Sequence, residues 1–121
     1  MEPVSPSAAV DRVEETWAPR IVAEANGQHV KVACLDGAFV WHAHPEADEL
    51  FYVLDGRLEI EFREEPTATL ERGDLLVVPA GVEHRPVAPV ETTVMLIEPA
   101  GTRNTGDAED SDLTVKDPKE L

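Results

Sequence analysis

The chain has 121 residues and a single cysteine, Cys34, which suits one domain with one core and excludes an intramolecular disulfide. Its 25 acidic and 10 basic residues give a formal net charge of -15, and such a surface repels nucleic acid and anionic lipid. Because no N-terminal apolar run is long enough for a signal peptide or a membrane span, we expect a cytoplasmic protein with neither nucleic acid nor membrane as a partner.

Residues 1–19 are predicted to form a short helical segment ahead of the main domain. Ser7 is a candidate N-cap, and Val10, Val13 and Trp17 are spaced along one helix face. An apolar helix stripe usually packs on a core, so we expect Trp17 to anchor this segment on the domain. A role for Trp17 in ligand stacking is the less favoured alternative.

From residue 20 to residue 99 the apolar pattern has a period of two, which is typical of strands. Asn-Gly and Asp-Gly turn signals separate these strands, at Asn26-Gly27, Asp36-Gly37 and Asp55-Gly56. The clearest strands are expected over 29–35, 51–54, 58–62 and 92–98. Many short strands at regular spacing indicate an all-β antiparallel sandwich or barrel.

The predicted strand over 29–35 has two faces that carry different side chains. Val30, Val32 and Cys34 share one face, whereas Lys31 and Ala33 take the other. If this alternation holds, Cys34 points into the barrel, where buried packing is favoured over a reactive thiol.

The stretch 41–56, WHAHPEADELFYVLDG, contains a candidate metal site. His42 and His44 are two residues apart, so on a strand both imidazoles project to one face. Pro45 cannot donate to a strand ladder and should break the strand, which can bring Glu49 onto the same face. Two imidazoles and a carboxylate that converge suit a borderline divalent metal ion.

A second stretch, GDLLVVPAGVEH over 73–84, adds His84 as a fourth candidate ligand. Together the two stretches resemble the paired motifs of the cupin superfamily, G-x5-HxH-x3/4-E-x6-G and G-x5-P-x-G-x2-H-x3-N. The matching positions are His42, His44, Glu49, Gly56, Gly73, Pro79, Gly81 and His84. Two positions depart from the pattern: Gly37 is one residue too close to His42, and Ala88 replaces the terminal Asn.

The resemblance implies a small double-sheet jelly roll over residues 20–99. Residues 100–121 are then an acidic extension, mostly solvated, in which 113–115 is the stretch apolar enough to dock. The EHRPVA and GTRNTGD segments also resemble a group of short stand-alone cupins that are often labelled mannose-6-phosphate-isomerase-like. The resemblance further implies a homodimer, to which Ile21, Val22 and the N-terminal helix are expected to contribute.

The four ligands His42, His44, Glu49 and His84 are expected to hold one divalent transition-metal ion, either iron, manganese, nickel or zinc. An octahedral ion would keep two positions open for water, dioxygen or an oxygen ligand. We expect the pocket wall to include Val40, Phe51, Val53, Leu58, Ile60 and Cys34, with Arg85 and Ala88 near the mouth. Arg85 could receive an anionic substrate, or it could pair with a surface acid.

Two classes of function remain open at this point. The first is a metal-dependent enzyme that acts on a small oxygen-rich molecule, either a dioxygenase or a sugar or keto-acid isomerase. The second is a metal-containing module that binds or senses a small molecule without turnover. A metal-free sugar epimerase of the same fold is the weakest alternative, because it leaves the full ligand set unexplained.

The acid-rich composition also favours a halophilic origin over ordinary acidic solubility, since only three of the ten basic residues are lysine. The Debye length falls from about 10 Å at 0.1 M salt to about 3 Å at 1 M, so repulsion between neighbouring acids should fade over this range. With metal saturating, we expect the melting temperature to rise steadily from low to molar potassium chloride. A flat or falling thermal-denaturation series would remove the halophilic interpretation.

Overall fold

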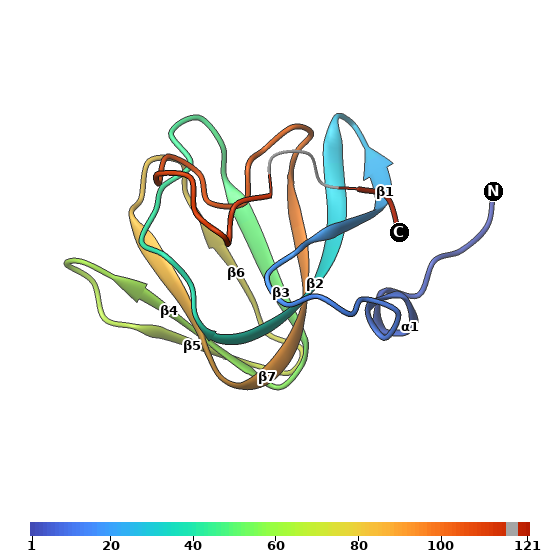
Figure 1. Ribbon diagram of the computed structural model, residues 1–121, viewed down its shortest axis with the longest axis horizontal. Helices are drawn as coiled ribbons and strands as arrows, with labels where there is room; N and C mark the ends of the chain where they lie inside the picture. Colours follow the sequence, from blue (N-terminus) through green and yellow to red (C-terminus); the bar gives the residue numbers. More distant parts are fainter. Residues whose placement is uncertain (116–118) are drawn as a thin grey trace.

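The computed structural model describes residues 1–115 and 119–121, and Figure 1 shows that antiparallel strands make up most of it. The predicted all-β fold with a short N-terminal helix is confirmed. In chain order the elements are α1 (Pro6–Val10), β1 (Arg20–Ala25), β2 (Gln28–Ala38), β3 (Glu49–Asp55), β4 (Arg57–Phe62), β5 (Ala68–Glu71), β6 (Leu75–Val78) and β7 (His84–Pro99). β1 begins at Arg20 and β7 ends at Pro99, and the division of the chain into three segments stays a prediction.

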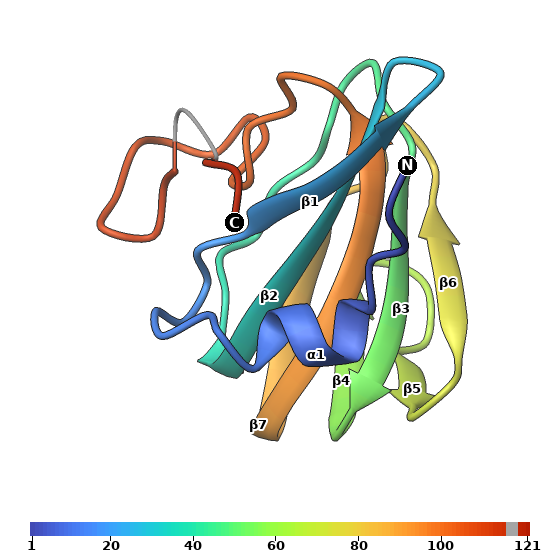
Figure 2. The same ribbon diagram turned by 90° about the vertical axis from the view of Figure 1, so that its right-hand side faces the viewer.

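β7 is the strand around which the sheet is assembled. The strands lie in the order β1-β2-β7-β3-β6, while β4 pairs with both β7 and β5. The first residues of β7 pair with β4, its last residues pair with β3, and β2 follows it along most of its length. The sequence pattern had identified only 92–98 of this long strand. As Figures 1 and 2 show, the strands curve around one interior, which contains the core.

The faces of β2 are the reverse of those predicted. Ala33 and Leu35 are buried in the main core, and Lys31 on the same face is 1% exposed. Val32 and Cys34 instead pack beneath α1, where the Cys34 thiol lies 3.5 Å from the Val13 carbonyl oxygen. The prediction that Cys34 points into the barrel is therefore wrong, because α1 covers the outer face and a buried partner retains Lys31 inside.

The N-terminal segment differs from the predicted helix in its cap and its length. Ser5, not Ser7, caps α1, and the helix ends at Val10. Trp17 therefore lies beyond the helix, with a positive φ of 58°, and its ring stacks on Phe39 at a centroid distance of 4.6 Å. Its indole nitrogen donates to the Asp36 carbonyl oxygen at 2.9 Å, so Trp17 does anchor this segment on the barrel.

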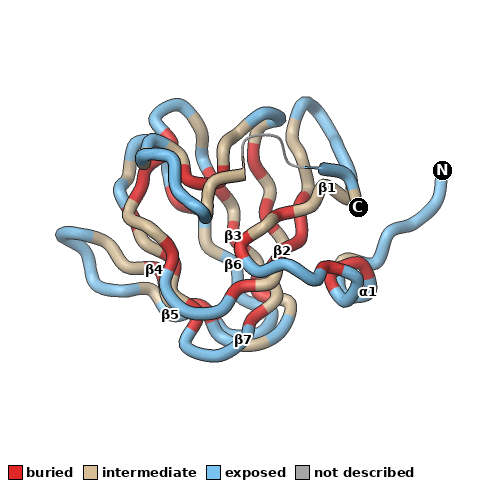
Figure 3. Tube along the Cα trace, in the orientation of Figure 1, coloured by how far each residue is buried: buried red, intermediate tan, exposed pale blue. Residues whose placement is uncertain are grey.

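The segment after β7 packs back onto the barrel, which contradicts the prediction of a mostly solvated extension. Asn104 and Thr105 within it are buried, and Figure 3 shows how burial varies along the whole chain. Asn104 donates through its side chain to the Trp17 and Leu113 carbonyl oxygens and accepts from the Val115 amide. Docking around residues 113–115 is as expected, since Leu113 packs against the main core. Residues 116–118 lie outside the described part of the chain.

Among the described residues, no helix has the length and apolar character needed to cross a membrane. The homodimer stays a prediction. Ile21, a predicted dimer contact, already pairs through its backbone with residues 119–121 of its own chain. The edge strand β6 exposes two apolar side chains, Leu75 and Val77, to solvent. Sedimentation in molar salt should give a dimer at micromolar concentration, and a monomer alone would contradict this expectation.

Candidate metal centre

His42 and His84 are positioned by matching backbone and side-chain contacts. Their backbones form a bridge, with the His42 amide 3.0 Å from the His84 carbonyl oxygen and the reverse bond at 2.8 Å. Each imidazole Nδ1 lies 2.9 Å from a carbonyl oxygen two residues earlier, that of Val40 and that of Val82. A carbonyl oxygen can only accept, so both Nδ1 atoms carry the hydrogen and each Nε2 is left as a free donor of electrons.

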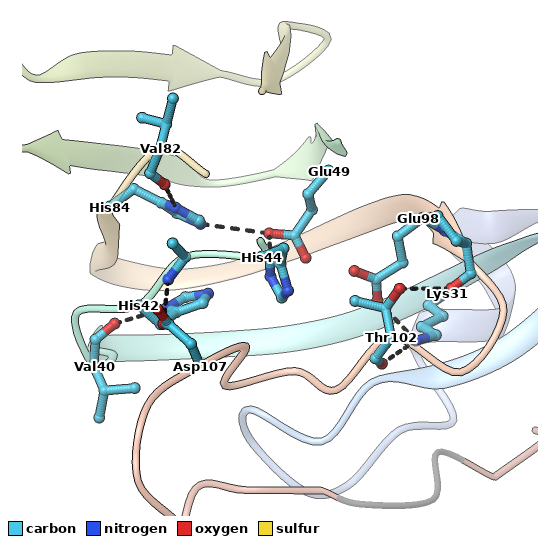
Figure 4. A network of polar contacts seen from close by, with 12 residues as sticks. Lys31, Val40, His42, His44, Glu49, Val82, His84, Glu98, Thr102 and Asp107 are labelled. Atoms are coloured by element: carbon cyan, nitrogen blue, oxygen red, sulfur yellow. Dashed lines mark hydrogen bonds and ion pairs between the residues drawn. The ribbon is translucent and has the colours of Figure 1, made fainter. Parts of the chain in front are cut away.

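His44 and Glu49 complete a four-residue cluster. Pro45 and Glu46 form a turn between the histidines and β3, as the sequence predicts, and this turn brings Glu49 to the histidine side. The Glu49 Oε1 lies 3.4 Å from His44 Nε2 and 3.5 Å from His84 Nε2. Figure 4 shows the four side chains converging, and their ligand atoms all lie within 4.8 Å of one another.

The cluster fits a metal ion because three of its potential ligand atoms have no hydrogen-bond partner in the described chain. His44 Nε2, His84 Nε2 and Glu49 Oε1 are buried and have no hydrogen-bond partner within the described chain. Buried polar atoms are nearly always paired, so three unpaired atoms aimed at one point indicate a missing partner with positive charge. All four residues are buried, so these atoms are not open to bulk water.

The protonation states of the cluster also suit a cation. Burial lowers the pKa of His42 to about 4, and the neighbouring His84 acts in the same direction. Burial alone would raise the pKa of Glu49, but the neighbouring His44 and His84 side chains hold it well below its usual range. At neutral pH the site therefore offers a neutral His42 imidazole and the Glu49 carboxylate, the forms that bind metal.

A small cavity of about 30 Å³ adjoins the cluster, room for one or two water-sized groups. His42 and Glu49 form part of its wall, and Trp17, Phe39 and Phe51 supply aromatic surface. Phe51 is the predicted pocket residue that lines this cavity. Other predicted residues are in the barrel core without lining it, namely Val53, Leu58, Ile60 and Ala88, with Val40 packed at its edge.

Arg85 pairs with an acid at the surface of the barrel. Its Nε lies 2.7 Å from Glu61 Oε1, and its guanidinium is 5.5 Å from the centre of the Trp41 ring. This is the pairing with a surface acid that the sequence left open as an alternative.

Three residues near the centre were missed by the sequence reasoning. Lys31 and Glu98 form a buried pair, with Nζ and Oε1 2.7 Å apart, and Glu98 lines the cavity. Burial raises the pKa of Glu98 to about 9; the charge of Glu49 adds to this, and Lys31 opposes it. Asp107 bonds both backbone groups of Ala43, between the two histidines, accepting from its amide at 2.7 Å and donating to its oxygen at 3.0 Å.

Alternation could have identified Glu98 and Lys31. Val94, Leu96 and Glu98 share one face of β7, so an inward glutamate follows from the two buried apolar residues before it. The same parity places Lys31 with Ala33. No pattern of this kind identifies Asp107, because it lies in a segment without regular structure.

A protein-family model, a curated relative and several solved structures are similar to this chain. The model for Cupin_2, described as a cupin domain, matches residues 30–98. YdbB of Bacillus subtilis strain 168, which is named as an uncharacterized protein, is 38% identical over 91 residues, covering 75% of this chain and 80% of its own length. A cupin-2 domain containing protein from Shewanella frigidimarina has 40% identity and a TM-score of 0.76, covering 79% of this chain and 93% of its own.

A more distant match shows the fold alone. The crystal structure of hydroquinone 1,2-dioxygenase PnpCD, in complex with Cd²⁺ and 4-hydroxybenzonitrile, has 21% identity and a TM-score of 0.65. The match covers 80% of this chain and 72% of that one. The same barrel is therefore present in a protein of named oxygenase activity.

Proposed function

We propose, from the premise that this chain belongs to the cupin family, that it binds one divalent transition-metal ion and acts on a small oxygen-rich organic molecule. His42, His44, Glu49 and His84 would hold the ion. The observation that carries the proposal is the convergence of buried, unpartnered ligand atoms from these residues. Three imidazole nitrogens and one carboxylate oxygen suit iron, manganese, nickel and zinc alike.

When bound, such an ion would supply Lewis-acid or redox chemistry to an oxygen-bearing ligand. The chain itself orients the ligands, because the Val40 and Val82 carbonyls fix the rings of His42 and His84. Trp17, Phe39 and Phe51 give the cavity beside these ligands a largely apolar wall. Dioxygenase-type chemistry is supported by the fold shared with PnpCD. An ion held by His42, His44, Glu49 and His84 would also suit isomerase-type chemistry through its Lewis acidity.

A non-catalytic module that binds or senses a small molecule is the second candidate. A dioxygen-uptake screen over catechols, diketones and thiols separates the two. Uptake with one of these classes supports an oxygenase, while metal-loaded protein that binds a screened compound without turnover supports the module.

Elemental analysis tests the metal site itself. We expect close to one transition-metal ion per chain in the wild type and almost none in a His42→Ala/His44→Ala variant. His29→Ala is the matched control, because His29 pairs with Glu24 outside the cluster and its loss should leave the metal content unchanged. Circular dichroism should show that all three proteins are folded. Equal metal content in the wild type and the double variant would refute the assignment.

A further inference from the structure

Three neighbouring strands each contribute one buried polar side chain to a row inside the barrel. The strands lie in the order β2, β7, β3, and the side chains are Lys31, Glu98 and Glu49. Leu50 pairs with Ile97 in the ladder between β3 and β7. The next residues along this antiparallel ladder are Glu49 and Glu98, which therefore lie opposite one another. Because Glu49 is a candidate metal ligand, the row ends at the metal cluster.

The carboxyl group of Glu98 connects Lys31 to Glu49. It contacts the Lys31 ammonium at 2.7 Å on one side, and it is hydrogen-bonded to the Glu49 carboxyl on the other. Figure 4 shows the same order, with Glu49 between the histidine rings and Glu98, and with Lys31 beyond Glu98. Two carboxyl groups bond to each other only through a hydrogen that lies between them. This contact therefore fixes both the distance and the direction of the Glu49 carboxyl.

The row places two buried acids side by side, and this arrangement needs a cation at each end. Like charges directly opposite one another destabilise a sheet, and a buried charge is retained only where it has a partner. Lys31 is the cation at one end, and it also contacts the Thr102 carbonyl oxygen at 3.3 Å. At the other end Glu49 Oε1 lies 3.4 Å and 3.5 Å from the Nε2 atoms of His44 and His84, where the metal ion is proposed.

We propose that Lys31 and Glu98 are positioning residues, which hold the Glu49 carboxyl in the orientation in which it binds the metal ion. A glutamate side chain has several rotatable bonds, and fixing them costs conformational entropy unless a neighbour already holds the side chain. Hydrogen bonds from residues behind the ligands orient ligating carboxylates in this way. The inference rests on the proposed metal site, and it adds two residues that lie outside the ligand set.

The test compares Co²⁺ affinity in variants that either remove the pair or keep its contact with Glu49. Lys31→Met/Glu98→Leu removes both buried charges together, and we expect its Co²⁺ dissociation constant to rise about 10- to 100-fold. Glu98→Gln keeps an oxygen for Lys31 and an N–H for Glu49, so it should bind Co²⁺ to within about threefold of the wild type. Competition with a chelator of known affinity measures each constant. The visible absorption of bound Co²⁺, which depends on its coordination geometry, should change only in the variant that no longer fixes Glu49.

Arg57→Met/Glu59→Leu is the matched control, because it removes an ion pair that is also 2.7 Å long but lies away from the cluster, and its Co²⁺ affinity should equal that of the wild type. Lys31→Met/Glu98→Met repeats the removal with unbranched side chains, in case leucine does not fit the site. Wild-type affinity in the two removal variants overturns the inference, as does Glu98→Gln binding as weakly as they do. Unfolding of both removal variants, seen by circular dichroism, also overturns it, since the pair would then serve the fold. A wild type that binds no Co²⁺ refutes the metal site itself, and this inference with it.

Discussion

Replacing Glu98 by leucine while Lys31 is kept should lower the free energy of unfolding by about 3–5 kcal/mol. The substitution leaves the Lys31 ammonium inside the barrel, where it is 1% exposed and keeps only the Thr102 carbonyl oxygen, at 3.3 Å, among its hydrogen-bond partners in the described chain. The penalty comes from the unpaired charge and not from the lost volume, since leucine fills much of the space of glutamate. Urea unfolding followed by circular dichroism measures the change.

Two controls separate this cause from a general loss of packing. Lys31→Met/Glu98→Leu replaces the whole pair by apolar side chains and should be close to neutral, or more stable than the wild type by up to about 4 kcal/mol. Glu83→Ala breaks the Arg63–Glu83 pair, whose side chains are 55% and 48% exposed, and should change stability by no more than about 1 kcal/mol. If the double variant is as unstable as Glu98→Leu, charge burial is the wrong explanation.

The turns were predictable because some of their positions need a backbone conformation that glycine adopts most easily. Gly56 follows Asp55 in a predicted hairpin and has a φ of +96°. A Cβ there would lie 2.5 Å from Thr92 Oγ1 and 2.9 Å from the Glu91 carbonyl oxygen. The same glycine belongs to the family motif, so the local signal and the resemblance agree on one position. Alternation then gives the strands between such turns.

Alternation does not say which face of a strand is inside. On β2 both faces are apolar enough to be buried, and the prediction placed the face that carries Cys34 inside the barrel. In the structure both faces of β2 are covered: one packs in the barrel core and the other packs against α1. The choice is decided by Glu98, which lies far along the chain on β7 and supplies the buried partner that Lys31 needs.

The cluster of His42, His44, Glu49 and His84 could be proposed from sequence because its spacing is confined to two short stretches. Its surroundings could not, because they come from residues separated by long stretches of chain. Asp107 is 64 residues from Ala43, which it holds between the two histidines. Composition made the segment after β7 look solvated, yet its polar side chains are used for contacts with backbone groups.

Gly106→Ala tests whether that segment supports the metal centre. Gly106 has a φ of +54°, and a Cβ there would overlap the Ala43 carbonyl oxygen and lie 3.0 Å from His42 Cδ2. Either the segment moves away and Asp107 loses its bonds to Ala43, or the His42 ring shifts. We expect a loss of about 1–3 kcal/mol in unfolding free energy and a rise of about 10- to 100-fold in the metal dissociation constant.

Gly101→Ala is the matched control for the strain of a positive φ. Gly101 has a φ of +85°, and a Cβ there would meet nothing within 4 Å, so its substitution adds strain without a clash near the histidines. Competition with a chelator of known affinity measures the metal dissociation constant of each variant, and urea unfolding measures stability. The support depends on the close approach of Gly106 to Ala43, so only Gly106→Ala should weaken metal binding. Equal metal affinity in the two variants would mean that the segment after β7 packs on the barrel without holding the histidines in place.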